Sequence, residues 1–210
     1  MKFLGFLLEG TVVTLEIFFL TLLFSLPLGL LISFGRMSKN RLISAIVKVY
    51  IDIMRGTPLI LQLIVIYFAP SILFGLNIDR FIAAIIAFVL NYSAYFAEIF
   101  RGGIESMPKG QYEAAQVLGF TGTQTFMGII LPQVIKRILP PISNEVITLV
   151  KDTALVQTLG VSELYRVAKN EASRISSVTP LFIAGIFYFV MNWIVTRVFH
   201  IAEKKLNYYK

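Results

Sequence analysis

Five ionisable residues interrupt apolar stretches of this sequence and are its strongest candidates for chemistry: Glu16, Glu98, Glu145, Lys151 and Asp152. A charge placed in the hydrocarbon of a bilayer costs about 3 kcal/mol or more. Such residues therefore usually face a bundle interior or an aqueous cavity, where they pair and mark the path of an ion or solute. They are candidates to line a translocation path.

A strip of polar residues accompanies Asp152. Asn144, Thr148 and Asp152 follow one another at i, i+4 and i+8, so on a helix they share one face. Lys151 is adjacent to Asp152, and adjacent side chains do not face each other on a helix. The strip is typical of a translocation path, but Asn and Thr also hydrogen-bond between packed membrane helices without touching a substrate. The sequence leaves both interpretations open.

Glu98 and Glu16 each have a structural alternative. Glu98 precedes Arg101 by three residues, a spacing at which opposite charges form an ion pair on a helix. Glu16 lies about two turns into its apolar stretch, near the outer surface or beside a structural partner. If Glu16 and Glu98 faced one cavity, they would favour a substrate with a cationic side chain, such as lysine, arginine or histidine.

Several catalytic chemistries lack the residues they need. The sequence has no GxxxxGK[ST] phosphate-binding loop, no GxSxG and no HExxH. It has no cysteine, which excludes disulfides and cysteine-based metal sites, and its one histidine, His200, ends the last apolar stretch. We therefore expect no catalytic residue, no metal site and no cofactor bound by this chain.

Composition places the chain in a membrane. Of its 210 residues 57% are hydrophobic and 15% are charged, whereas about a quarter are charged in soluble domains. A helix crosses a bilayer with about 20 apolar residues. The sequence predicts an all-α membrane protein, a single transmembrane domain over residues 1–210, with five spans at about 10–34, 57–76, 81–100, 138–161 and 180–199. The first is too long for a signal-peptide core and is taken as a retained span.

The lysines and arginines predict the orientation, because connections rich in them stay in the cytoplasm. One set of connections carries thirteen: Arg36, Lys39, Arg41, Lys48, Arg55, Arg101, Lys109, Lys136, Arg137, Arg197, Lys204, Lys205 and Lys210. The other set carries five: Lys2, Arg80, Arg166, Lys169 and Arg174. The N-terminus is then outside and the C-terminus in the cytoplasm. The same distribution explains the net charge of +7 without a nucleic-acid partner.

Two connections are expected to be more than linkers. Residues 36–55 alternate in polarity and predict an amphipathic helix along the inner surface. Residues 160–178 predict a polar helix outside the membrane, which either meets a soluble partner or caps the bundle. Arg55 is expected to anchor the chain at the cytoplasmic interface, where Gly56 allows a turn and Thr57-Pro58 begins the next helix.

The connection between the third and fourth spans predicts a docking helix. Ser106 as N-cap, Pro108 in the first turn and Gly119 as the stop predict a helix at about 107–118. On it, Glu113 offers a charge, while Ala114 and Ala115 offer so little bulk that another protein could close tightly over this face. The three residues alone also fit an ordinary amphipathic helix at the membrane surface.

The wider spacing carries a resemblance. Glu113-Ala114-Ala115, then Gly119, then Ile129 with Leu131-Pro132 is similar to the EAA signature of permease subunits in binding-protein-dependent ABC importers. Further stretches resemble the polar amino-acid branch of that family: Arg55-Gly56-Thr57-Pro58, NYSAYFAEIFR from Asn91 to Arg101, Gly110-Gln111, and Leu149-Val150-Lys151-Asp152-Thr153. The resemblance implies a type I importer-like fold with a cytoplasmic coupling helix, whose contact with the ATPase involves Glu113, Ala114, Ala115, Gly119 and Pro132.

The resemblance also implies partners and a function. The partners are a second permease chain, cytoplasmic ATPase subunits that hold ATP and Mg²⁺, and an extracytoplasmic solute-binding protein, in a bacterial or archaeal cell membrane. The function is ATP-driven import of polar amino acids by alternating access. From the residues alone, two other functions stay open: an ion- or proton-driven carrier with proton sites at Glu16, Glu98 and Asp152, and a membrane anchor for a soluble complex.

Overall fold

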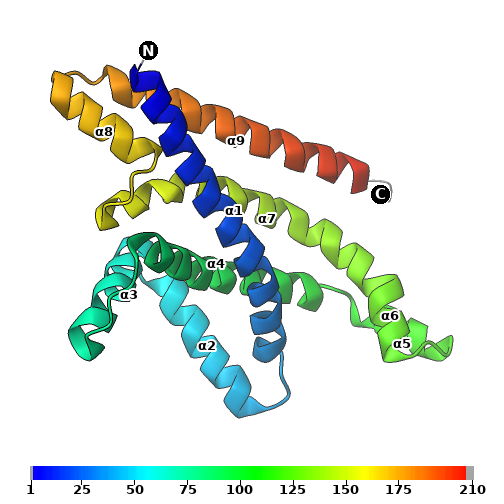
Figure 1. Cartoon of the computed structure of the whole chain (residues 1–210). Coiled ribbons are helices and arrows are strands. Elements are labelled where there is room, and N and C mark those ends of the chain that lie inside the picture. The colour runs from blue at the N-terminus through cyan, green and yellow to red at the C-terminus, as the bar shows by residue number, and fades with distance from the viewer. Residues whose placement is uncertain (1, 207–210) are drawn as a thin grey trace.

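The computed structural model describes residues 2–206, and over this range the chain is helical, with no strand. Lys210 and the side chain of Lys2, both used in the charge count, lie outside the described part. Figure 1 shows the helices, which in chain order are α1 (Lys2–Arg36), α2 (Arg41–Gly56), α3 (Leu59–Phe74), α4 (Arg80–Glu105), α5 (Lys109–Val117), α6 (Gly122–Thr125), the π-helix η1 (Phe126–Ile130), α7 (Leu131–Asp152), the 3₁₀-helix η2 (Thr153–Leu159), α8 (Leu164–Ile175) and α9 (Thr179–Leu206).

The core of the molecule is the pair α1 and α4, which contact each other more extensively than any other two elements. Phe88, Tyr92 and Phe96 follow one another at i, i+4 and i+8 on α4 and are fully buried. The two helices approach closely at Gly29 of α1, where an added Cβ would lie 2.8 Å from the Cβ of Phe96 and 3.0 Å from the carbonyl oxygen of Ser93. Small residues allow this approach between membrane helices.

Gly29→Ala is therefore expected to destabilise the chain. The added methyl group forces α1 or α4 to shift, and overpacking of this kind typically costs about 1–3 kcal/mol. Gly185→Ala on α9 is the matched control, because its added Cβ would meet nothing within 4 Å. Thermal unfolding in detergent should show a lower midpoint for Gly29→Ala alone. Equal midpoints would show that α1 and α4 do not pack this closely.

Helices α2 and α3 correspond to the predictions for residues 36–76. The two helices meet at a bend of 110° around Thr57 and Pro58, and together they form one candidate span. Helix α2 confirms that residues 36–55 contain an amphipathic helix: Val47, Ile51 and Met54 pack toward α4, while Lys48 and Asp52 are exposed. The Tyr50 hydroxyl donates to the Leu90 carbonyl at 2.6 Å, and the position of α2 along the inner surface stays a prediction.

Helix α7 begins earlier than predicted. The expected span at 138–161 corresponds to α7 and η2, which run from Leu131 to Leu159 and end at Gly160 in the left-handed conformation. Proline is tolerated in the first turn of a helix, where Pro132 lies, and α7 therefore includes the polar residues between Pro132 and residue 138. Of the described helices, α1, α4 and α9 are each long and apolar enough to cross a bilayer, and the bent pair is a fourth candidate. A fifth span, formed by α7, stays a prediction.

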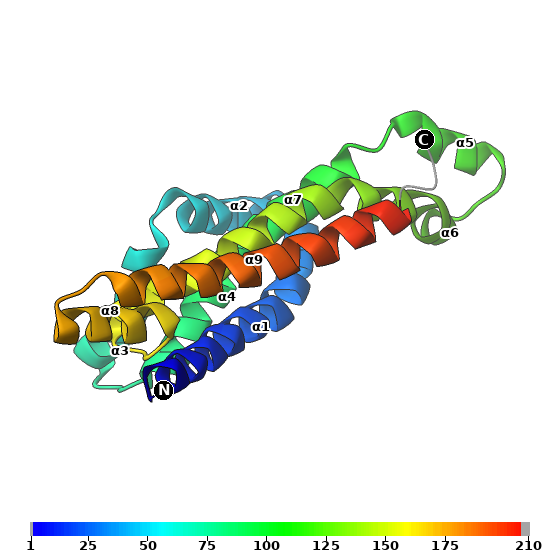
Figure 2. The same ribbon diagram turned by 90° about the horizontal axis from the view of Figure 1, so that it is seen from above.

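The two ends of the molecule carry different elements (Figure 2). One end holds the beginning of α1, α8 and the beginning of α9, whereas α5, α6 and the end of α9 lie at the other end. Helix α8 confirms that residues 160–178 contain a helix. The charge count assigned residues 160–178 and residues 101–137 to opposite sides of the membrane, and this orientation stays a prediction.

Glu163 fixes α8 to the bundle. Its carboxylate caps α8 by accepting hydrogen bonds from the backbone N–H groups of Tyr165 and Arg166, each at 2.7 Å, and accepts a third from the Tyr188 hydroxyl of α9 at 2.9 Å. The side chain is fully buried. Burial raises the pKa of the Glu163 carboxyl above its ordinary value, and these hydrogen bonds oppose the increase.

Candidate functional site

A polar groove of about 570 Å³ lies where the α2–α3 bend meets α4 and α7. Its lining combines charged, aromatic and amide side chains with the exposed backbone of the bend: Arg55, Gly56, Thr57, Pro58, Leu59, Asn91, Tyr92, Tyr95, Glu145, Thr148, Asp152 and Leu155. Membrane helices tolerate such a break where it lines a cavity and its freed backbone groups find partners. The groove therefore has the form of a solute site.

Side chains at the bend satisfy its backbone. Asn91 of α4 donates through Nδ2 to the carbonyl of Met54 and to Oε1 of Gln62, both at 3.0 Å. Gln62 of α3 donates through Nε2 to the carbonyls of Met54 at 3.0 Å and Thr57 at 3.2 Å. In a continuous helix these backbone carbonyls would accept hydrogen bonds from the following turn. At the bend they accept from the Asn91 and Gln62 amides instead, which stabilises the bend beside the groove.

The groove has acidic groups on α7 and a basic group on the bend. The Tyr92 hydroxyl donates to Oδ2 of Asp152 at 2.8 Å and fixes that carboxylate. Glu145 lies near enough to Arg55 and Asp152 to interact electrostatically with both. On the opposite wall, the Arg55 guanidinium lies 5.3 Å from the centre of the Tyr95 ring, a cation–π distance.

The Arg55 side chain is oriented by an acidic residue of α4. Nη1 of Arg55 lies 3.7 Å from Oε2 of Glu98. Glu98 in turn accepts from Arg101 at 2.9 Å and 2.7 Å, which confirms the i, i+3 ion pair predicted from the sequence. Arg101 also pairs with Glu105. The chain of alternating charges along α4 therefore orients Arg55.

The structure brings only some of the predicted path residues together. Thr148 and Asp152 line the groove, as does the neighbouring candidate Glu145. Asn144 and Lys151 are exposed and do not line it. The face of α7 that enters the groove therefore holds Glu145, Thr148 and Asp152, so that Glu145 replaces Asn144 of the predicted strip and the other two positions agree.

Glu16 and Glu98 do not share the groove. Glu16 is exposed on α1, on the same face as the exposed residues Val12 and Phe19. Glu98 lies beneath Arg55 and does not line the groove. The conditional argument for a cationic substrate, which required these two carboxylates in one cavity, therefore fails in its original form.

Sequence reasoning missed three residues of the site: Arg55, Tyr92 and Tyr95. Arg55 was predicted only as an anchor at the cytoplasmic interface, and the structure shows that it lies at the α2–α3 bend and lines the groove. A usable signal existed, since Gly56-Thr57-Pro58 interrupts helical sequence between two stretches that are each too short to span alone. Tyr92 meets Asp152 across 60 positions of sequence, a contact that no local pattern encodes.

The predicted docking helix is present as α5, with a different start. Ser106 ends α4 instead of capping α5, because its hydroxyl donates to the Gly103 carbonyl at 2.7 Å. Gly119 adopts φ +80°, which confirms the left-handed stop. Glu113 and Ala114 are exposed, whereas Ala115 is buried within this chain, so only part of the predicted face is open to a partner.

The apolar surface next to α5 was not predicted. Val117 is 87% and Leu118 75% exposed, which is unusual for large aliphatic side chains. Both flank the Gly119 turn and lie next to the exposed Glu113 helix. Pro132 is also exposed, in the first turn of α7. The open surface around α5 thus combines one acidic side chain with aliphatic ones.

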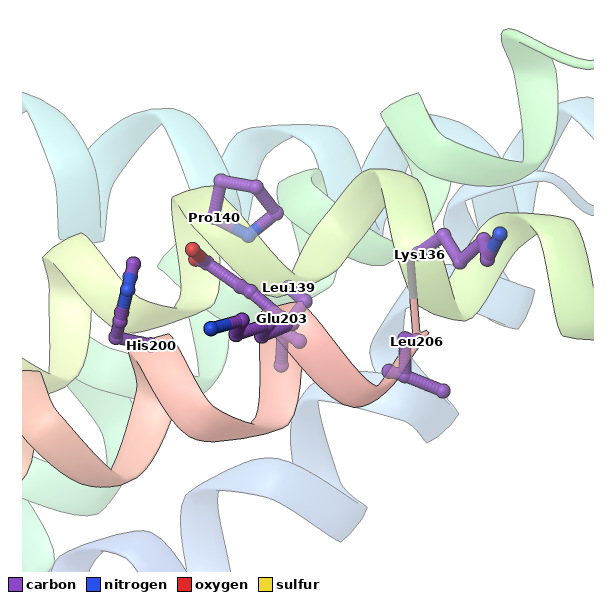
Figure 3. A pocket seen from close by; sticks show the side chains of 7 residues that line it. Lys136, Leu139, Pro140, His200, Glu203 and Leu206 are labelled. Atoms are coloured by element: carbon purple, nitrogen blue, oxygen red, sulfur yellow. The ribbon is translucent and has the colours of Figure 1, made fainter. Parts of the chain in front are cut away.

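A second hollow, of about 440 Å³, lies between α7 and α9 (Figure 3). Its lining has both signs of charge and several apolar side chains: Lys136, Leu139, Pro140, His200, Glu203, Lys204 and Leu206. His200 and Glu203 both extend from α9 into it. It shares no residue with the polar groove. Within residues 2–206, no cluster of His, Cys, Asp and Glu is suited to hold a metal ion.

Comparisons with known proteins give the groove a context. Residues 25–208 match the family described as binding-protein-dependent transport system inner membrane component. The chain is 40% identical to the arginine transport system permease protein ArtQ of Bacillus subtilis (strain 168), over 96% of this chain and 93% of that protein. It is 37% identical to the putative glutamine transport system permease protein GlnP of Rickettsia felis (strain ATCC VR-1525 / URRWXCal2), with the same coverage.

Solved structures agree with these relatives. A crystal structure of an amino acid ABC transporter with histidines has a TM-score of 0.90 and 36% identity, covering 97% of this chain and 95% of that chain. An inward-facing structure of the MetNI methionine ABC transporter, at a TM-score of 0.74 and 19% identity over 97% of this chain and 95% of that one, shares the fold. The chain therefore belongs to the family of inner-membrane components of binding-protein-dependent transport systems, as an amino-acid ABC permease subunit.

Proposed function

We propose that this chain is the membrane-spanning subunit of an ATP-driven importer that prefers cationic amino acids and receives them in the groove between the α2–α3 bend, α4 and α7. The observation that carries the proposal is the arrangement of charges in that groove. Two carboxylates, Glu145 and Asp152, line the side formed by α7, and the Arg55 guanidinium lines the side formed by the bend. An amino acid presents matching groups, a carboxylate for Arg55 and an ammonium for Asp152.

The balance of charge favours a cationic side chain. The charged residues that line the groove, Arg55, Glu145 and Asp152, together carry a formal charge of −1 at neutral pH, in the ordinary ionisation states of their side chains. A zwitterionic amino acid leaves this excess in place, whereas arginine, lysine or histidinium neutralises it. Since an unbalanced charge is costly away from water, the cationic substrate binds better. The relatives' names include both arginine and glutamine and so do not choose between cationic and neutral substrates. The charge of the groove is the observation that favours the cationic ones.

The topology and partners complete the proposal. With α2–α3 as one broken span and α7–η2 as another, the chain crosses the membrane five times, with its N-terminus and α8 outside and α5 in the cytoplasm. A second permease chain, two ATPase subunits that hold ATP and Mg²⁺, and an extracytoplasmic binding protein form the working assembly. Helix α5 with Glu113 and the Gly119 turn docks on the ATPase. In alternating access, ATP binding favours the orientation in which the groove opens to the outside. The binding protein delivers the substrate to the groove in that orientation.

Uptake of radiolabelled amino acids into vesicles that contain the assembled transporter tests the proposal. We expect uptake to require ATP on the side of the membrane where the ATPase subunits are bound. We also expect arginine, lysine or histidine to compete more strongly than glutamine. Dissipating the proton gradient with an uncoupler should leave the rate unchanged, because no ion gradient drives the cycle. Uptake that needs the gradient and ignores ATP would favour an ion-driven carrier, and preference for glutamine would refute the charge-balance argument.

A further inference from the structure

A pair of glutamines joins α5 directly to α7. Nε2 of Gln111 donates to Oε1 of Gln133 at 2.9 Å, and Nε2 of Gln133 donates back to Oε1 of Gln111 at 2.9 Å. Nε2 of Gln133 also donates to the Ile129 carbonyl at 2.7 Å, which fixes the Gln133 amide on its own helix. The pair is partly buried and spans 22 positions of sequence. Two parallel bonds between flat amides define orientation as well as distance.

Two further contacts close the base of the same segment. Nη1 of Arg137 donates to the Ser106 carbonyl at 2.8 Å, which joins the end of α4 to α7. Met107 is buried and packs with Ile130 and Val134. Residues 106–137 therefore form a closed loop whose base is held by polar and apolar contacts, with α5 and α6 carried on it (Figure 1).

The covalent connection between α5 and α7 is a poor mechanical link by comparison. It passes through an exposed turn around Gly119, at residues 118–121, and beyond this turn α6, η1 and α7 follow one another as an uninterrupted helical run. The turn lies outside the regular helices, and the π-helical η1 is a local departure from the regular hydrogen-bond ladder. A displacement of α5 would be absorbed there unless a side-chain contact bypassed the turn.

We propose that Gln111 and Gln133 are positioning residues that transmit the displacement of α5 to α7, and through α7 to the groove. Helix α7 carries Glu145, Thr148 and Asp152, and about 22 Å of helix separates Gln133 from Thr148. The inference rests on the proposed docking of α5 on an ATPase. It adds that the amide pair, more than the covalent connection, couples ATP binding to the orientation of the groove.

Charge-substituted glutamines provide the test. Gln111→Glu removes the N–H that donates to Oε1 of Gln133, and Gln133→Lys removes the oxygen that accepts from Nε2 of Gln111, so each single variant loses one bond of the pair. The double variant Gln111→Glu with Gln133→Lys restores the contact as an ion pair. Thr123→Glu, exposed on α6 with the same added charge, is the control for Gln111→Glu.

The readouts are the number of ATP molecules hydrolysed per amino acid imported and the stimulation of the ATPase by the loaded binding protein, both in the complete assembly. We expect each single variant to raise the ATP cost about tenfold, a typical coupling ratio, and the double variant to return it toward wild type. Thr123→Glu should leave it unchanged. The coupling experiment uses whichever amino acid the wild-type transporter imports, so it does not depend on the substrate being cationic. Import of arginine by wild type tests that part of the proposed function separately.

Two outcomes would overturn the inference. One is normal coupling in both single variants. The other is loss of coupling in the double variant as large as in the singles, with all three complexes recovered intact, because this would show that the amides act through something other than their mutual contact.

Discussion

The double variant Glu145→Gln with Asp152→Asn is expected to lose uptake of arginine and lysine while it keeps a measurable uptake of glutamine. The two carboxylates supply the negative charge of the groove, and the Tyr92 hydroxyl still has an amide oxygen to bond at position 152, so the shape of the site is preserved. Removing one member of a desolvated charge pair costs about 2–5 kcal/mol, so the rate for a cationic substrate should fall by more than about 30-fold.

Lys151→Gln is the matched control for this variant. Lys151 is exposed and outside the groove, and its positive charge acts on Asp152, so neutralising it should not lower the uptake of a cationic substrate. Competition assays with arginine and glutamine in the same vesicles measure the change in preference. An equal loss for both amino acids in the double variant would contradict a role in selecting charge and would indicate a structural one.

Glu113→Lys is expected to abolish ATP-dependent uptake without preventing membrane insertion. Glu113 is exposed on α5, four residues before the exposed Val117, so reversing its charge disturbs no contact described inside the chain. On a docking surface the same change replaces attraction by repulsion, and like charges across an interface cost several kcal/mol. Loss of that size amounts to at least about a hundredfold in affinity. Co-purification of the ATPase and uptake in vesicles should therefore decline together.

A control for Glu113→Lys is Glu203→Lys, the same reversal of charge on α9. Glu203 faces the hollow between α7 and α9, away from the polar groove. We expect the Glu203 variant to keep both the ATPase and uptake. If the Glu113 variant retained the ATPase and transported normally, α5 would not be the docking element, and the aliphatic surface at Val117 and Leu118 would need another explanation.

Predictions from the sequence succeeded where the controlling interactions are local. Glu98 and Arg101 pair because they lie three residues apart on one helix, and Gly119 ends α5 because the left-handed conformation costs glycine little. The apolar stretches locate α1, α4 and α9, since bilayer thickness sets the length of such a stretch. The spacing of the EAA signature identified the family.

The helix starts were harder to predict. A serine before a proline is a good N-cap, yet Ser106 bonds backward to Gly103 and ends α4. The fourth span was expected to begin at about residue 138, yet α7 begins at Leu131, with Pro132 in its first turn. Both errors arise because a local signal is compatible with two neighbouring structures and packing selects one of them.

The groove itself was decided by tertiary structure. Arg55 belongs to it only because α2 packs along α4 and the chain bends by 110°, which brings the guanidinium to Glu98 and Tyr95. The face of α7 that enters the groove holds Glu145 instead of Asn144, since helix rotation depends on what packs behind it. Sequence by itself determined the class of protein and the residues available for solute recognition. Which of them meet was decided by packing between segments up to 60 residues apart, because no local interaction specifies the contact of Tyr92 with Asp152.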